Sequence, residues 1–297
     1  MNYFLEEEWL SLMEKVGTVS RARCLDIAGN PVWVGEYQNA GQKKWQLYGS
    51  WEEGGVAWLE ALFVLGRRQG IFQVECAFNM ARWSDQVLLT EVGAEITAEF
   101  GTYVVDLKQN QDQLWSGLHG KHRNMINRAG RDGLEVRFDV TVDPFTAMMD
   151  ETYAKGGVEN PFSRSYLTHL FALSGKRLLR AGVFSSQGLE AGAVVPWDGS
   201  WGYFLHGATR SDPRPGAANL LHWEVMLELQ RRGVAGYDFG GARRDTDDPR
   251  LAGIFRFKER FGGTFIPCWY WRKVISPGRK WWHDAVVGMR GWGGGTV

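Results

Sequence analysis

The sequence predicts an α/β protein made of a duplicated unit. Helices, antiparallel strands, a long helix and further strands follow one another in the same order in both halves. Composition agrees, because 44% of the 297 residues are apolar and 23% are charged, as in a globular protein with its own core. The stretch DPF at 143–145 marks the junction. We therefore predict domains at 1–142 and 143–275, followed by a C-terminal segment at 276–297.

The first half opens with a predicted helix over residues 1–17, where apolar residues recur at helical spacing. Its other predicted elements are strands at 21–27, 31–37, 45–49, 71–78, 101–107 and 134–140, and a helix at 56–70 that ends on glycine. A long regular helix is predicted over 111–133. One face of it, about 120° wide, holds Leu114, Trp115, Leu118, His122, Met125, Ile126 and Ala129. This position favours a core histidine at 122 over a metal ligand.

The second half is predicted to begin with two helices. Its elements are helices at 144–155, 163–174, 217–233 and 251–263, and strands at 177–184, 189–197, 201–209, 235–241 and 264–271. The helix at 217–233 is apolar almost all round, so we expect it to be buried, with His222 as a second core histidine. For 276–297 we predict a helix that packs on the domain junction, followed by a disordered tail, GGGTV.

Composition also excludes several classes of protein. The formal net charge is zero, so any polyanion must be held by a local basic patch. Cys24, Cys76 and Cys268 are far apart and odd in number, which favours reduced thiols over disulfides or a zinc site, and the six histidines share no metal spacing. The acidic N-terminus is unlike a signal peptide and no stretch is long enough to span a membrane, which predicts a cytoplasmic protein without stable membrane insertion. A final helix explains Trp281-Trp282, and a peripheral membrane contact is the alternative if the ligand is lipid-linked.

Residues 237–263, YDFGGARRDTDDPRLAGIFRFKERFGG, end a strand on a glycine pair and place Phe257-Lys258 on the next helix. Spacing alone favours a solvated lysine beside Glu259. The alternative is a lysine at the mouth of a pocket, where its ammonium neutralises charge that develops on a transition-state oxygen. The role of Asp238 also has two interpretations. We favour a carboxylate that caps the turn over one that orients or deprotonates an attacking amine.

Three stretches, in the right order and spanning nearly the whole chain, resemble the Fem family, whose members build the cross-bridge of bacterial peptidoglycan from aminoacyl-tRNA. They are FLEEEWLSLMEKVG, GTYVVDLKQNQDQLWSGLHGKHRNMINRAGRDGLEVR and the stretch at 237–263. The second resembles the family's KxRxxIxxA core at Lys121, Arg123, Ile126 and Ala129. The third resembles its YDFGG…GIxxFKxxFGG signature. Unlike some members, the chain has no inserted coiled-coil arm.

The resemblance implies an α/β fold of two tandem domains of the GCN5-related N-acetyltransferase (GNAT) type, with mixed sheets. It implies an enzyme that transfers an amino acid from aminoacyl-tRNA to an amine of a peptidoglycan stem peptide, carried on UDP-MurNAc-pentapeptide or on lipid II, without a cofactor. An activated ester and a good amine need little covalent help, so positioning and charge stabilisation can suffice. The resemblance assigns Lys258, flanked by Phe257, to stabilising charge in the transition state.

Other site residues follow less directly from the resemblance. Arg164 and Tyr203 lie where the family's diphosphate contacts come, and a surface arginine at a helix start explains Arg164 equally well. Around the glycine pair, the expected substrate-binding residues are Tyr237, Asp238, Gly240 and Gly241, whose glycines let backbone approach a bound peptide. The candidate tRNA contact is a basic edge formed by Lys121, Arg123, Arg128 and Arg131. An ordinary solvated helix face explains that edge as well.

Two other functions remain open from the sequence. One is an N-acyltransferase of the same fold that uses an acyl-CoA or aminoacyl-tRNA donor and acylates a small-molecule amine. The pyrophosphate-binding pattern of such enzymes, Q/R-x-x-G-x-G/A, is only echoed by PRPGAA, because Pro213 stands where the basic or amide residue belongs. The other is a protein that binds cell-wall peptide without turnover, against which the intact Phe257-Lys258 pair argues. The amino acid transferred, the accepting amine and the oligomeric state are not predicted.

Overall fold

The computed structural model describes residues 3–49, 54–78, 80–173 and 177–276. The chain divides into two compact units, which are called unit 1 (residues 1–3 and 101–266) and unit 2 (residues 4–100 and 267–297). Segments of the two units alternate along the chain, so the bounds of the units differ from those of the sequential domains predicted at 1–142 and 143–275. The C-terminal helix and disordered tail were predicted at 276–297, and all of these residues except residue 276 lie outside the described part of the chain.

Unit 2 holds a curved sheet in the order β1-β2-β3-β4-β12. Its elements are η1 (Tyr3–Leu5), α1 (Glu7–Lys15), β1 (Arg21–Ile27), β2 (Asn30–Asn39), β3 (Gln42–Leu47), α2 (Gly55–Arg68), β4 (Gln73–Cys76), α3 (Gln86–Glu91) and most of β12 (Thr264–Val274). Neighbouring strands are antiparallel except β3 and β4, which are parallel. The short helix α3 was not predicted. Asp85 caps it by accepting a hydrogen bond from the Leu88 amide.

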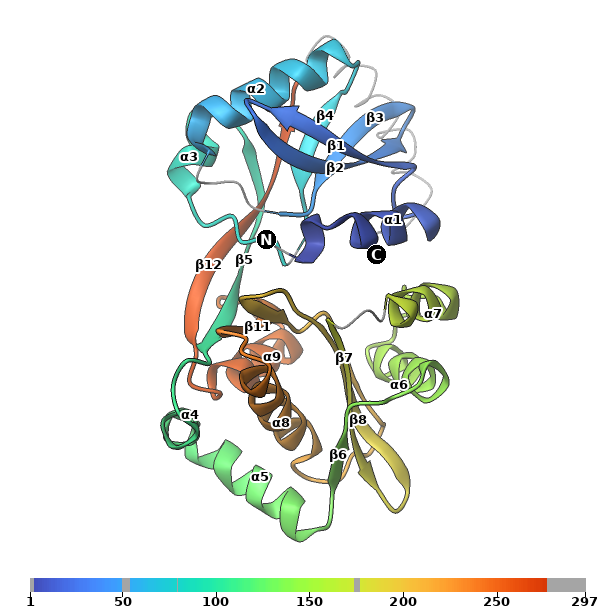
Figure 1. The fold of residues 1–297 in the computed structure, drawn as a ribbon, viewed down its shortest axis with the longest axis vertical. Coiled ribbons are helices and arrows are strands. Elements are labelled where there is room, and N and C mark those ends of the chain that lie inside the picture. The colour runs from blue at the N-terminus through green and yellow to red at the C-terminus, as the bar shows by residue number, and fades with distance from the viewer. Residues whose placement is uncertain (1–2, 50–53, 79, 174–176, 277–297) are drawn as a thin grey trace. The chain divides into compact units, whose positions relative to one another are not determined.

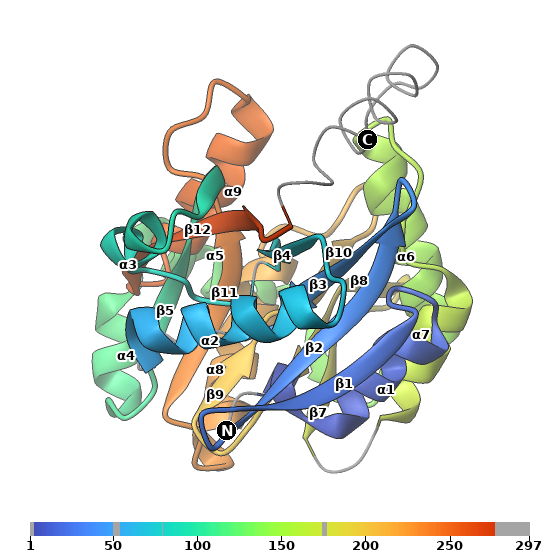
Figure 2. The same cartoon turned by 90° about the horizontal axis from the view of Figure 1, so that it is seen from above.

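The core of unit 2 lies between α2 and this sheet. Helix α2 buries one face, which carries Trp58, Leu59, Leu62 and Phe63. These side chains share a buried cluster with residues of the strands, among them Val34, Trp45, Val74 and Trp271. Figure 2 shows α2 across the sheet and β1 and β2 as a long antiparallel ribbon. Aromatic side chains therefore supply much of the buried apolar area that stabilises this unit.

Unit 1 holds an antiparallel sheet in the order β10-β8-β7-β6 and a second group of strands in the order β5-β11-β9. Its elements are β5 (Glu95–Asp106), α4 (Gln111–Gly117), α5 (Gly120–Arg131), β6 (Glu135–Arg137), α6 (Val142–Lys155), α7 (Arg164–Ala172), β7 (Leu178–Ser185), β8 (Gly188–Pro196), β9 (Trp201–Tyr203), β10 (His206–Thr209), α8 (Ala217–Arg231), β11 (Gly236–Ala242) and α9 (Pro249–Glu259). Strands β5 and β12 each belong partly to both units.

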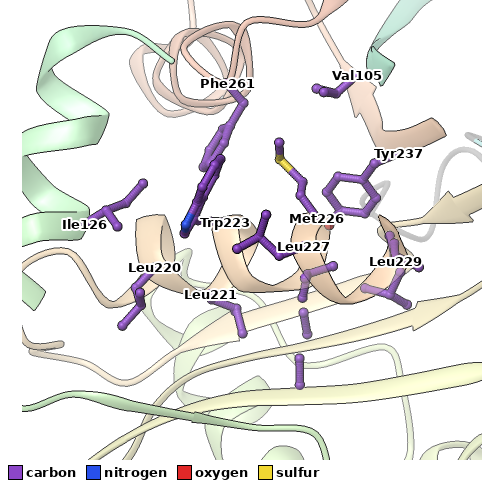
Figure 3. Packing of buried hydrophobic residues seen from close by; sticks show 14 of the residues in the cluster. Val105, Ile126, Leu220, Leu221, Trp223, Met226, Leu227, Leu229, Tyr237 and Phe261 are labelled. Carbon is purple, nitrogen blue, oxygen red and sulfur yellow. The ribbon is translucent and has the colours of Figure 1, made fainter. Parts of the chain in front are cut away.

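Helix α8 is the centre of unit 1, as its apolar sequence predicts. It is buried over most of its length, because it packs on β7 and β8 and against α5. Figure 3 shows its side chains among those of neighbouring elements, including Ile126 of α5, Phe261 after α9 and Tyr237 of β11. Helices α6 and α7 lie on the other face of the antiparallel sheet (Figure 1).

Two predicted elements are divided in the structure. The helix predicted over 111–133 is broken, because Leu118 is extended (φ −64°, ψ 138°) and His119 starts a new helix by accepting the Lys121 amide through Nδ1. The strand predicted over 201–209 becomes β9, parallel to β11, and β10, antiparallel to β8. At the switch, the Phe204 amide donates to Asp238 of β11, and the Leu205 amide donates to Val194 of β8. The two groups of strands therefore part at this point.

Candidate functional site

A cavity of about 540 Å³ lies in unit 1, near the point between β9 and β10 where the chain leaves β11 and pairs with β8. Apolar side chains dominate its wall, among them Phe204, Leu221, Ile254 and Phe257. The polar side chains of the wall include those of Lys258 and His222. A largely apolar pocket with a few convergent polar groups is the usual form of a ligand site.

Lys258 is buried in this wall and not solvated, contrary to the interpretation that spacing favoured. The residue is 7% exposed, and its Nζ donates to the carbonyl oxygens of Gly240 (3.2 Å) and Gly241 (2.7 Å). Burial lowers the pKa of Lys258 to about 8, against the opposing influence of the Asp238 charge. The site therefore holds an ammonium group that two neutral carbonyl dipoles hydrogen-bond, at the edge of an apolar cavity.

The glycine pair turns these carbonyls toward Lys258. The register of β11 against β5 shifts between Asp238 and Gly241, and Gly240 has φ 69°, a backbone conformation that favours glycine. The buried Asp238 carboxylate accepts the Gly240 amide at 2.8 Å, and the Thr102 hydroxyl lies within hydrogen-bond distance of both residues. Asp238 thus caps the bulge, as its favoured interpretation predicts, whereas no sequence pattern indicated Thr102.

The C-terminal turn of α9, which carries Phe257 and Lys258, is held in place by hydrogen bonds from the start of α5. The Phe257 carbonyl accepts a hydrogen bond from His122 Nε2 at 3.0 Å, and the Arg260 carbonyl accepts the His119 amide at 2.9 Å. Burial lowers the pKa of His122 to about 4, so its imidazole is neutral. Gly262 follows with φ 78°, and a Cβ there would lie 2.5 Å from the Gly117 carbonyl oxygen. These contacts orient Lys258 toward the cavity.

His222 and Tyr237 form a buried pair beside Lys258. The Nδ1 atom of His222 lies 3.0 Å from the Tyr237 hydroxyl. Burial, with a smaller contribution from the charge of Lys258, lowers the pKa of His222 to about 3, so the ring is neutral. The sequence predicted His222 as a core histidine. It is buried as expected, and it also lines the cavity, which helical spacing could not show.

The structure brings six of the predicted site residues together and leaves two elsewhere. Around the bulge lie Tyr237, Asp238, Gly240, Gly241, Phe257 and Lys258. Arg164 is exposed at the start of α7 and pairs with Asp143. Tyr203 is buried and donates to Asp198 at 2.8 Å, away from the cavity. Its neighbour Phe204, just after β9, lines the cavity instead.

The predicted basic edge is partly engaged within the protein. Arg123 donates to the carbonyls of Ser116 and Leu118 and so caps the end of α4. Arg128 pairs with Asp132 at 3.5 Å. Lys121 and Arg131 are exposed.

The described part of the chain contains neither a cluster of metal-binding side chains nor a helix that could span a membrane. No three histidine, cysteine, aspartate or glutamate side chains there converge into a possible metal site. Likewise, none of the described helices has the length and apolar character needed to cross a membrane.

Comparisons with known proteins bear on this geometry. The acetyltransferase (GNAT) domain family matches residues 119–259, a range that includes Phe257 and Lys258. A lipid II:glycine glycyltransferase of Staphylococcus epidermidis is 35% identical over 78 residues, which are 26% of this chain and 18% of that protein. The crystal structure of FemX superposes with a TM-score of 0.76 at 12% identity, over 95% of this chain and 94% of that one. The resemblance to the Fem family is confirmed.

The predicted fold is confirmed as well. A tandem GNAT protein from the clavulanic acid biosynthesis pathway superposes with a TM-score of 0.50 at 14% identity, over 91% of this chain and 94% of that one. The chain thus has the Fem-like fold of tandem GNAT domains with mixed sheets. Its matched segment spans about a fifth of the length of the curated glycyltransferases, 18% in each case.

Proposed function

We propose that this chain is an aminoacyltransferase that moves an amino acid from aminoacyl-tRNA to an amine of a peptidoglycan stem peptide. The acceptor is UDP-MurNAc-pentapeptide or lipid II, and the reaction takes place in the cytoplasm or at the inner face of the membrane. The observation that carries the proposal is the buried ammonium of Lys258 in an apolar cavity, within the segment that matches the GNAT family. Similarity to lipid II:glycine glycyltransferases supports an amino acid as the transferred group and a peptidoglycan precursor as the acceptor.

The proposed reaction needs little from the protein beyond position and charge. Attack of an amine on the ester carbonyl builds negative charge on the carbonyl oxygen, and a positive group in a poorly solvated wall stabilises that charge strongly. Lys258 suits this role because carbonyl groups of Gly240 and Gly241 hold its ammonium without neutralising it. Phe257, its neighbour, supplies part of the apolar wall. No cofactor is required.

A coenzyme A donor is disfavoured by the loop before α8. Such donors place their pyrophosphate on free amides at a helix N-terminus. Here the buried carboxylate of Glu190 accepts the Arg214 amide at 3.0 Å and pairs with Arg210 at 3.2 Å. Although burial acts to raise it, hydrogen bonds from Ser185 and Arg214 and the charge of Arg210 lower the pKa of Glu190. The Arg214 amide is therefore already occupied by an internal carboxylate and is not free to bind a pyrophosphate.

The decisive experiment gives the purified chain both acceptors in turn, with a pool of charged tRNAs, with and without ribonuclease. Mass spectrometry then looks for added amino-acid masses on the acceptor. The proposal expects a mass increase that ribonuclease abolishes and that identifies the amino acid. A parallel reaction with acetyl-CoA and small amines covers the alternative donor. Products in that arm alone, or in neither arm, would refute the proposal.

A further inference from the structure

The tautomer of His222 can be inferred from its hydrogen bonds. Among the described residues, the Tyr237 hydroxyl has one hydrogen-bond partner, Nδ1 of His222. Tyr237 is fully buried, and a buried hydroxyl hydrogen without an acceptor costs about 1–3 kcal/mol. Burial, and then the Asp238 charge, raise the pKa of Tyr237 well above its ordinary value, so the hydroxyl keeps its hydrogen. Tyr237 therefore donates to Nδ1, and the hydrogen of the neutral imidazole lies on Nε2.

The other edge of the imidazole opens onto the cavity. His222 lines the cavity while Tyr237 lies behind it in the core. The Nε2 atom of His222 forms no hydrogen bond with a described residue. It is also not one of the solvent-inaccessible polar atoms without a partner in the described residues, so it is not fully enclosed. Aromatic rings hold the imidazole in place, with centroids at 4.6 Å for Phe204 and 5.7 Å for Phe257. The cavity wall thus presents a fixed N–H donor.

Lys258 and His222 border the same part of the cavity. The Nζ atom of Lys258 lies 5.9 Å from the centroid of the Phe204 ring, which the imidazole contacts edge to face. The charge of Lys258 also acts on His222, which places the two groups within electrostatic reach. An ammonium and a neutral N–H donor at one apolar wall form a site for an oxygen that becomes negative during a reaction.

We infer that His222 donates its Nε2–H to the ester carbonyl oxygen in the transition state, as a second donor beside Lys258. This inference rests on the proposed function. In that reaction the amine nitrogen bonds to the carbonyl carbon and loses a proton, while the bond from carbon to the ribose oxygen breaks and that oxygen gains a proton. The carbonyl oxygen carries the negative charge between these events. His222 is then a catalytic residue, and Tyr237, which fixes its tautomer, is a positioning residue.

The first part of the test needs no substrate. A long-range proton–nitrogen correlation spectrum of the protein, labelled with nitrogen-15 in histidine, reports which ring nitrogen carries hydrogen. We expect His222 to be neutral with hydrogen on Nε2 at neutral pH, and Tyr237→Phe to lose this fixed tautomer. Hydrogen on Nδ1 in the wild-type protein would overturn the inference whatever the enzyme transfers.

The second part measures transfer in single-site variants. His222→Leu removes the donor, and we expect kcat to fall about 100-fold with KM within about threefold, because only the transition state is affected. His222→Gln can place an amide N–H near the Nε2 position and should recover about tenfold of that loss. Tyr237→Phe should lower kcat by about tenfold. The matched control is His206→Leu, since His206 is also buried against a tyrosine hydroxyl but does not line the cavity.

The outcomes separate this inference from the proposed function. An active wild-type enzyme whose kcat survives His222→Leu would overturn the inference and leave the proposed function intact. The inference also fails if His206→Leu lowers kcat as much as His222→Leu, because the effect is then general destabilisation. A wild-type protein that transfers nothing to either acceptor overturns the proposed function and, with it, the role of His222 in it.

Discussion

The two units each bury a lysine, and the two lysines are held in different ways. In unit 2, Lys44 on β3 is 6% exposed, and its charge is favoured by the Glu75 carboxylate of the adjacent strand β4. In unit 1, Lys258 is 7% exposed and donates to two neutral carbonyls at a cavity wall. Burial lowers the pKa of both groups, and the shift is large enough to bring Lys258 to about 8.

The difference separates a structural cation from a reactive one. Glu75 also accepts hydrogen bonds from Tyr37 and Gln73, so Lys44 belongs to a compensated polar cluster inside unit 2. The Asp238 carboxylate likewise favours the charge of Lys258, but Lys258 borders the cavity, where a ligand can use that charge. A buried lysine therefore indicates function mainly when it borders a cavity.

The largest expected effect comes from removing the ammonium of Lys258. Lys258→Met should lower transfer by about 100- to 1,000-fold, because one charge-stabilising donor is worth about that much. Arg256→Met is the matched control, since Arg256 is exposed on the same helix and should keep nearly wild-type activity. Mass spectrometry of the acceptor measures both. Equal activity in the two variants would show that Lys258 is as structural as Lys44.

The second effect concerns stability and pH. The pKa of Lys258 is lowered in the folded state to about 8, so between about pH 8 and about pH 10 the unfolded chain binds more protons than the folded chain. The wild-type free energy of unfolding should therefore rise, relative to that of Lys258→Met, by about 2 kcal/mol from about pH 7 to about pH 9.5. Urea unfolding at the two pH values measures this. A constant difference would mean that the folded pKa of Lys258 is not lowered.

The third effect tests the bulge that orients the carbonyls. Gly240→Ala forces an alanine into φ 69° and should lower stability by about 1–2 kcal/mol, with about a tenfold loss of transfer as the carbonyls move away from Lys258. Gly233→Ala is the control, since Gly233 has φ 78° in open space after α8. It should lose comparable stability and no activity. If both variants transfer equally well, the bulge does not set the position of Lys258.

The smallest effect is expected at Lys44. The pKa of this group is lowered by burial while Glu75 opposes the shift, so stability should again rise with pH relative to Lys44→Met, by less than it does for Lys258. Urea unfolding at the same two pH values measures it. A change as large as that expected for Lys258 would remove the contrast between the two lysines.

Sequence patterns predicted most helices and strands, because apolar spacing reflects which face is buried. They failed at 111–133 and 201–209, where the chain keeps a regular pattern but changes partners. The break at Leu118 depends on the cap by His119 and on contacts with the end of α9, and the switch at Phe204 depends on β8 and β11. Such contacts join residues far apart in sequence, which periodicity does not record.

The candidate site was predicted unevenly for the same reason. The motif placed Phe257, Lys258 and the glycine pair, because those residues lie close together along the chain. Spacing alone would have left Lys258 in solvent. His222 also looked like an ordinary core residue, because a helical wheel shows that a face is buried but not that a cavity lies beside it.

The most direct test of the central role of Lys258 is the pH dependence of kcat/KM for aminoacyl transfer, measured from initial rates between about pH 6.5 and about pH 9.5. This ratio reports the ionisation of groups in the free enzyme and in the free substrates, so the wild-type value is divided by that of Lys258→Met at each pH to cancel the ionisation of the attacking amine. If the charged Lys258 ammonium stabilises the transition state, this quotient falls as the pH rises through about 8. A quotient that stays level or keeps rising to about pH 9.5 would contradict that role.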